Sequence, residues 1–193
     1  MGIADAGKSN VTPPGLPPLK GDLSDPLKSG GDKKYAPGTV WDSEKDAVRA
    51  AARYVDSLNA AHPVLKHYEL GGWVYYSEDG FSFNITTSYK SNTINRSDLL
   101  SLRVGDSVAV WHTHNFLVDT GLGEKFSGYD SGDKGVSREF NMPIYLYSPQ
   151  HKIYAFEHQD VKLQNVNIQG RQRLMSVPYG TRREIKNVEP KAL

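Results

Sequence analysis

The clearest periodic pattern of apolar residues runs from residue 44 to residue 60, where they recur every three or four positions. Asp42 or Ser43 stands in front of this stretch and can cap a helix, and acidic residues fill its first turn. His62 precedes Pro63, and a residue before proline avoids the helical conformation. The pattern therefore predicts one amphipathic helix over residues 44–60. Its apolar face comprises Val48, Ala51, Ala52, Val55 and Leu58.

After this helix the pattern becomes extended, with aromatic and β-branched residues in short runs. Residues 67–76 and 81–90 flank the turn sequence SEDG and should pair as a hairpin. Residues 97–100 can open a short helical turn, and residues 105–114 (GDSVAVWHTH) form a short apolar run typical of a buried strand. Further strands are expected at residues 142–149, 151–158 and 172–180, after a long loop. This order predicts an α+β domain with a mixed, mainly antiparallel β-sheet and a packed helix.

Residues 1–40 differ in composition from the rest of the chain. Glycine, proline, serine, lysine and aspartate dominate this segment, and large apolar residues are few. Such a segment buries too little apolar surface to offset the entropy lost when the chain becomes ordered, so we expect a flexible leader or linker here. The folded domain is then expected to span residues 41–193. With 193 residues in total and 38% hydrophobic composition, the chain is long enough for one well-buried core.

The composition narrows the chemistry of any site. The chain has no cysteine, which excludes disulfides, thiolate nucleophiles and cysteine-ligated metals, so a metal must rest on histidine, aspartate and glutamate. The formal net charge is +1, and the basic residues near the C-terminus are diluted by glutamates and lack interleaved aromatics, so no nucleic-acid partner is expected. Neither a membrane-spanning run nor a secretory signal is visible in the sequence.

Two histidines end the strand expected at residues 105–114. Because side chains at i and i+2 of an extended segment point to the same side, His112 and His114 can bind one ion. The alternative to a metal site is a pair in which one imidazole is buried and hydrogen-bonded and the other is solvated. Only a third ligand would distinguish a metal site from such a pair. Asp130 follows a glycine-rich loop that can fold back onto the strand end; Asp119 and Asp133 are alternatives, although loop aspartates are usually solvated. Two imidazoles and one carboxylate make an open zinc site of the hydrolytic type.

This combination resembles the JAMM (MPN-plus) metalloproteases, whose pattern is an upstream glutamate, His-[Ser/Thr]-His, a spacer and Ser-x-x-Asp. The match runs from Trp41 to Phe156. The resemblance implies that His112, His114 and Asp130 bind Zn²⁺, that Glu69 is the general acid/base, and that Ser127 helps to stabilise the oxyanion. Glu78 and Glu124 compete with Glu69 for its role. The spacer, residues 115–126, is longer than the family's, and Asn115 replaces the usual proline.

The resemblance also implies a fold and an activity. The fold would be the JAMM or cytidine-deaminase-like α/β/α arrangement, and the activity a zinc metallopeptidase that cleaves an amide or isopeptide bond in a protein, a ubiquitin-like conjugate or a peptidoglycan peptide. The closest likeness is to JAMM-like C-terminal domains of bacterial polymorphic, Rhs-type toxins. That likeness implies export by a specialised secretion system and a cognate immunity protein. The alternatives are a catalytically silent binding or scaffold module and a metal-dependent nuclease or phosphoesterase.

Overall fold

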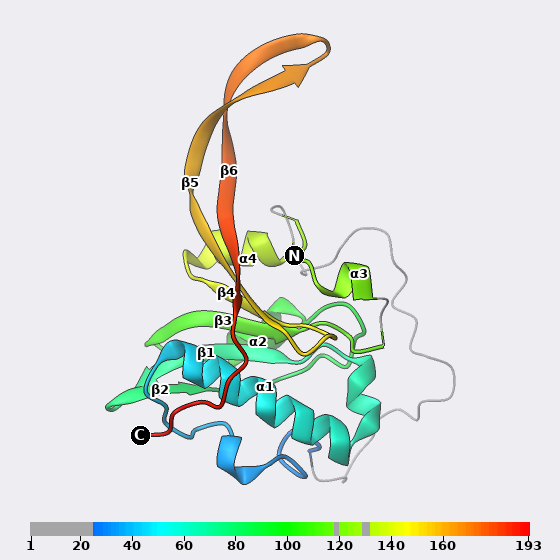
Figure 1. The fold of residues 1–193 in the computed structure, drawn as a ribbon, viewed down its shortest axis with the longest axis vertical. Coiled ribbons are helices and arrows are strands. Elements are labelled where there is room, and N and C mark those ends of the chain that lie inside the picture. Colours follow the sequence, from blue (N-terminus) through cyan, green and yellow to red (C-terminus); the bar gives the residue numbers. More distant parts are fainter. Residues whose placement is uncertain (1–24, 118–119, 129–131) are drawn as a thin grey trace.

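A computed structural model describes residues 25–117, 120–128 and 132–193. Figure 1 shows a twisted sheet with helices beside it and one long hairpin that stands away from the rest. The six strands of the sheet follow the order β2-β1-β3-β4-β5-β6. All neighbours are antiparallel except β3 and β4, which are parallel. The expected α+β class with a mixed, mainly antiparallel sheet is therefore confirmed.

Helix α1 spans Glu44–Ala61, close to the predicted range. Ser43 is its N-cap, and the Ser43 side chain accepts a hydrogen bond from the amide of Asp46, as expected for this residue type. His62 is the C-cap, and the short 3₁₀ helix η2 (Pro63–His67) follows directly. The buried face of α1 contains every residue of the predicted apolar stripe.

The predicted first hairpin forms, but its strands are shorter than predicted, and His67 lies in η2 instead of a strand. Strand β1 (Gly71–Ser77) and strand β2 (Gly80–Phe83) pair in register from Val74–Phe83 to Ser77–Gly80, so the SEDG sequence forms the turn. Helix α2 (Arg96–Ser101) covers the predicted helical turn, and strand β3 (Ser107–Thr113) lies within the predicted buried strand. Strand β3 then lies between β1 and β4 (Ile144–Tyr147), at the centre of the sheet.

The core has one layer of side chains on each face of the sheet. The first cluster joins α1 to the side chains of Trp111, Tyr145 and Tyr147. The second cluster joins α2 and α4 to Val110 and Leu146. Because neighbouring residues of one strand fall into different clusters, the sheet is covered by α1 on one face and by α2 and α4 on the other.

The segment expected to be one long loop contains two helices. Helix α3 (Thr120–Gly123) is a single turn, and helix α4 (Asp133–Phe140) packs Val136 into the second core cluster. Helix α4 ends at Phe140, and its C-cap Asn141 has left-handed backbone torsions (φ 50°), as residues after a helix often do. Its sequence gave a weak helix signal because Gly135 is unfavourable in a helix interior, so packing on the sheet must supply its stability.

Strands β5 (Ile153–Ile168) and β6 (Arg171–Ile185) are much longer than the strands expected from the sequence. They pair up to a two-residue turn at Gln169 and Gly170, both with positive φ, as favoured hairpin turns require. Figure 1 shows this hairpin extending far beyond the other strands. Among the described residues, no helix is long and apolar enough to cross a bilayer.

Part of the segment interpreted as a leader packs on the domain. Residues 1–24 lie outside the described residues, whereas residues 25–40 include the 3₁₀ helix η1 (Lys33–Tyr35). Leu27 is buried, and its backbone carbonyl accepts a hydrogen bond of 2.9 Å from the hydroxyl of Tyr54 in α1. The packed part of the chain therefore begins before Trp41, at least at Leu27.

Candidate metal centre

His112, His114 and Asp133 form a compact group of metal-ligating side chains. One ligand atom from each lies within 4.8 Å of the other two. The two histidine Nε2 atoms are 3.3 Å apart, and the Asp133 carboxylate oxygens lie 3.2 Å from Nε2 of His112 and 3.5 Å from Nε2 of His114. His112 and Asp133 are buried, and His114 is partly exposed. These residues could hold a metal ion, with His114 on the side nearer to solvent.

The far side of each imidazole is occupied by a backbone carbonyl. Nδ1 of His112 lies 3.0 Å from the carbonyl oxygen of Tyr145, and Nδ1 of His114 lies 3.0 Å from that of Gly123. A carbonyl oxygen can only accept a hydrogen bond, so each Nδ1 must carry a proton. In the neutral rings both Nε2 lone pairs then point at the same small volume. Metal-binding histidines are commonly oriented in this way by a partner on the other nitrogen.

Strand pairing explains why the histidines lie beside the start of β1. Gly71 pairs with His112 in the antiparallel register. The Thr113 amide donates to the carbonyl of Leu70 at 2.7 Å, and the Thr113 hydroxyl accepts from the Leu70 amide at 3.0 Å. The pairing therefore continues to the residue before Gly71 and places Glu69 opposite His114. Residues opposite each other share a face of the sheet, so Glu69 lies on the histidine side.

Gly71 is required for this close approach. An added Cβ at position 71 would lie 2.6 Å from the carbonyl oxygen of Trp111 and 3.0 Å from Cα of His112. Both atoms belong to the backbone of β3 and cannot move without disturbing the strand that carries the histidines. The glycine therefore has a direct packing role beside the candidate metal centre.

Asp133 is held in place by Ser127. The Ser127 amide donates to a carboxylate oxygen of Asp133 at 2.8 Å, and the Asp133 amide donates to the Ser127 hydroxyl at 2.8 Å. Asp133 is also the first residue of α4, where a negative charge is favoured by the helix dipole. Gly132 allows this pairing, because a Cβ there would lie 2.3 Å from the Ser127 hydroxyl oxygen. Ser127 thus orients the carboxylate that faces the histidines.

The pKa values of His114 and Asp133 are coupled to each other in the metal-free group. Burial would lower the pKa of His114, but the hydrogen bond and charge of Asp133 outweigh it and raise this pKa to about 9. Burial would raise the pKa of Asp133, but the facing charges and hydrogen bonds of His112 and His114 hold it well below its usual range. His114 is therefore protonated at neutral pH when no metal is bound.

Glu69 lines the same small cavity as His112 and Asp133, and the volume of this cavity is about 30 Å³. That space is sufficient for a water molecule. Burial raises the pKa of Glu69 to about 7, against the lowering effect of the two histidines. The backbone of Glu69 is fixed by a hydrogen bond from the Thr87 hydroxyl at 2.7 Å. A carboxyl group with this pKa can both accept and donate a proton near neutral pH.

The other candidates from the sequence lie elsewhere or cannot be placed. Asp130 and Asp119 lie outside the described residues. Glu78 is in the β1–β2 turn with φ 48°, at the end of β1 remote from the histidines. The Glu124 carboxylate accepts a hydrogen bond from the amide of Gln150 at 3.1 Å. The sequence analysis ranked Asp133 below Asp130 as a ligand; in the structure Asp133 is the first residue of α4 and is buried, which a loop aspartate usually is not.

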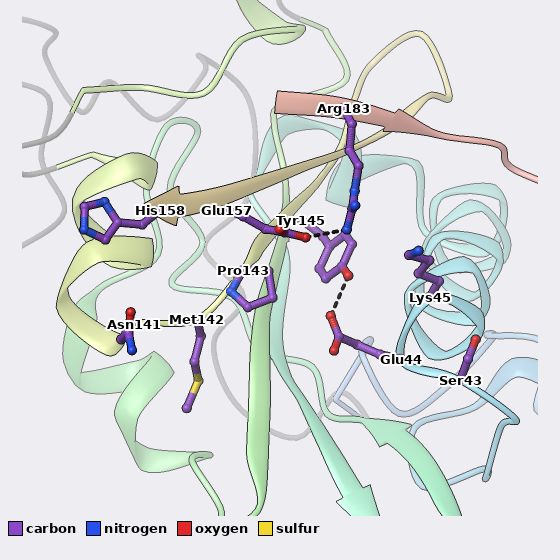
Figure 2. A pocket seen from close by; sticks show the side chains of 10 residues that line it. All are labelled: Ser43, Glu44, Lys45, Asn141, Met142, Pro143, Tyr145, Glu157, His158 and Arg183. Carbon is purple, nitrogen blue, oxygen red and sulfur yellow. Dashed lines mark hydrogen bonds and ion pairs between the residues drawn. The ribbon is translucent and has the colours of Figure 1, made fainter. Parts of the chain in front are cut away.

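A larger hollow lies apart from this group. Its volume is about 450 Å³, and Figure 2 shows the side chains that line it, from α1, the segment before β4, and strands β4, β5 and β6. Two pairs of lining residues bind each other: Tyr145 donates to Glu44, and Arg183 forms an ion pair with Glu157. The lining charges largely satisfy one another, and none of the three candidate ligands borders this space.

Comparison with known proteins adds no assignment. No protein-family model, curated protein or solved structure matches the chain. Any functional inference therefore rests on the residues and geometry described above.

Proposed function

We propose that the protein is a zinc-dependent hydrolase of the JAMM type that cleaves an amide or isopeptide bond. The observation that carries this proposal is the convergence of two imidazole Nε2 atoms and one carboxylate on a single point, with a fourth titratable group, Glu69, on the same cavity. Two histidines and one carboxylate suit zinc and leave a coordination position open, as catalytic zinc sites require. The absence of cysteine fits a ligand set of this kind.

His112, His114 and Asp133 would hold the metal in this proposal. Asp133 takes the place that the family pattern gives to the aspartate of Ser-x-x-Asp, and Ser127 orients it through two hydrogen bonds. The bound ion would supply a Lewis acid that makes water nucleophilic near neutral pH. Glu69 would accept the proton of that water and pass it to the leaving amine, for which a pKa of about 7 is well suited.

A peptide-like substrate suits the surroundings of His114. Leu117, which follows the histidine strand, is 57% exposed, and Leu122, next to the carbonyl that binds His114, is 61% exposed. Exposed leucines beside a candidate catalytic group can contact an extended substrate. Protein tails, ubiquitin-like conjugates and peptidoglycan peptides all remain within this proposal, as does delivery as a toxin with a cognate immunity protein.

The test combines metal analysis with substrate turnover. The purified protein is expected to contain one zinc ion per chain and to hydrolyse members of a panel of peptides, isopeptide conjugates and cross-linked peptidoglycan, in a reaction that a chelator blocks. Glu69→Gln should keep the zinc and lose the activity, whereas Glu78→Gln should keep both. A folded protein that takes up no zinc would contradict the proposal, and so would zinc uptake without turnover on any of the three substrate types.

A further inference from the structure

The β5–β6 hairpin continues far beyond the sheet to which its base belongs. Strand β4 pairs with β5 only as far as Phe156, so residues 159–180 consist of β5 and β6 alone. We call this part the projecting hairpin, and Figure 1 shows it standing clear of the helices and the other strands. A two-stranded ribbon has little stability of its own in water, so a surface of this length without a partner is unusual.

Strand β6 is the last strand of the sheet, and within the described sheet no strand pairs with its outer edge. An open edge presents unpaired amide and carbonyl groups that can accept a further strand. The edge is 15 residues long, from Arg171 to Ile185, and is therefore long enough for an added strand of ordinary length.

Each face of the hairpin near its tip carries exposed apolar side chains among polar ones. Ile168 pairs with Arg171 and Gln164 with Met175, which places these four residues on one face, while Leu174 lies on the other. Leu174 is 63% exposed and Met175 is 41% exposed. A flat bilayer surface would contact one face only. A strand added at the edge contacts both faces, because its own side chains alternate.

The charge near the tip is basic and uncompensated. Arg171 and Arg173 share a face, and neither side chain forms a hydrogen bond or ion pair with any described residue. The arginines at the base are paired: Arg182 donates to the carbonyl of Glu124 at 2.9 Å, and Arg183 binds Glu157. Two copies joined at this edge would bring arginines together, which disfavours self-association.

From these contacts we propose that the outer edge of β6 in the projecting hairpin binds an extended segment of another protein in which acidic and apolar side chains alternate. The acidic side chains lie beside Arg171 and Arg173 on one face, and an apolar side chain lies beside Leu174 on the other. Backbone hydrogen bonds supply the affinity, and the side-chain pattern supplies the selectivity. This binding surface goes beyond the proposed hydrolase activity and does not depend on it.

The test uses the full chain and a short fluorescent peptide in which glutamate alternates with valine, with a lysine-valine peptide as the control. The glutamate peptide is expected to bind in low salt, to protect the outward-pointing amides among residues 171–175 from hydrogen exchange, and to bind about tenfold more weakly to R171E/R173E. The matched reversal K33E/K152E, at two exposed lysines outside the hairpin, should bind like the wild type. Leu174→Ser should also weaken binding, without changing the melting temperature of the domain.

Several results would overturn the proposal. These are no binding of the glutamate peptide, equal binding of the lysine peptide, or binding that survives both R171E/R173E and Leu174→Ser. Binding of phosphatidylglycerol vesicles or duplex DNA without binding of the peptide would assign the surface to a different class of partner. Zinc content measured on the same variants should be unchanged, so that a failure here is separate from a failure of the metal centre.

Discussion

The Nε2 atoms of His112 and His114 face each other at 3.3 Å, and a backbone carbonyl occupies the opposite nitrogen of each ring. Two neutral rings in this arrangement would direct their lone pairs at one another, which is unfavourable without a cation between them or close by. Asp133 adds a negative charge on the same point. A proton can satisfy this arrangement in the metal-free protein, and a divalent ion held by the three side chains would satisfy it as well.

Loss of either histidine should abolish metal binding. We expect His112→Ala and His114→Ala to reduce zinc from one ion per chain to a trace, because two remaining ligands are too few for a stable site. His67→Ala, at the end of η2, removes a histidine that lies outside the group and serves as the control. Elemental analysis after dialysis measures the result. Full zinc content in both variants would show that the metal is held elsewhere.

The third ligand can be identified by comparing two aspartates. We expect Asp133→Asn to weaken zinc binding by about tenfold or more, because the amide lacks the charge that faces both histidines. Asp130→Asn is the matched change at the residue that the family pattern favours, and it should leave zinc affinity unchanged. Competition with a zinc chelator measures both affinities. The reverse ranking would return the ligand role to Asp130.

Glu69 should be needed for turnover and not for the metal. Glu69→Gln keeps the size of the side chain but cannot transfer a proton, so the rate of hydrolysis should fall about a hundredfold or more. Zinc content should not change. Glu78→Gln, on the exposed turn at the other end of β1, should retain the wild-type rate. Equal rates in the two variants would exclude Glu69 as the acid/base.

Zinc binding should release protons below about pH 9. The pKa of His114 is raised to about 9 in the metal-free protein, so zinc must displace a proton from His114 at neutral pH. Affinity should therefore rise with pH until that value is passed. Calorimetric titrations in buffers of different ionisation enthalpy count the protons released. No release at pH 7 would contradict the raised pKa.

The same shifts predict how the stability of the metal-free protein depends on pH. The raised pKa of His114 stabilises the fold below the unfolded value of 6.5, and this contribution is lost as pH rises toward 9. The lowered pKa of Asp133 stabilises the fold above 3.8, and this contribution is lost as pH falls. The stability advantage of the wild type over His114→Gln should hence be largest between these limits and shrink toward pH 9, as measured by urea unfolding in chelator.

Gly71 should tolerate no side chain. Gly71→Ala places a Cβ 2.6 Å from the carbonyl oxygen of Trp111, and overpacking of this kind costs about 1–3 kcal/mol. Gly105→Ala is the control, because a Cβ there meets no atom within 4 Å. Thermal unfolding of both variants gives the comparison. A melting temperature for Gly71→Ala equal to that of Gly105→Ala would show that the strands can separate at no cost.

Local patterns were sufficient to predict the strand that carries His112, and they placed Glu69 and His114 in predicted strands as well; in the structure Glu69 lies just before β1 and His114 just after β3. Helix α1, the first hairpin and strand β3 each have a strong period and clear ends, and i, i+2 spacing put both histidines on one side. Helix α4 was missed because it is short, holds Gly135 in its interior and buries few apolar side chains. Asp133 was ranked below Asp130 as a ligand because α4 was not predicted. The burial of Asp133 depends on how α4 packs against the sheet, and the sequence does not show this packing.

The extent of the β5–β6 hairpin was also not predicted. Its outer half has exposed, polar-rich strands, so the sequence lacks the alternation that marks a strand packed on a core. The turn could have been recognised in the sequence at Gln169-Gly170, because a glycine that follows a residue able to adopt positive φ favours a two-residue hairpin turn. The length of pairing on either side of that turn is set by cross-strand hydrogen bonds, which a single sequence does not reveal.

The most direct test of the metal centre is anomalous diffraction at the zinc edge, from crystals of the protein prepared with one equivalent of zinc. A single peak bonded to Nε2 of His112, Nε2 of His114 and a carboxylate oxygen of Asp133 is the predicted result. A peak at any other set of residues, or no peak in a crystal where these three side chains are ordered, would contradict it.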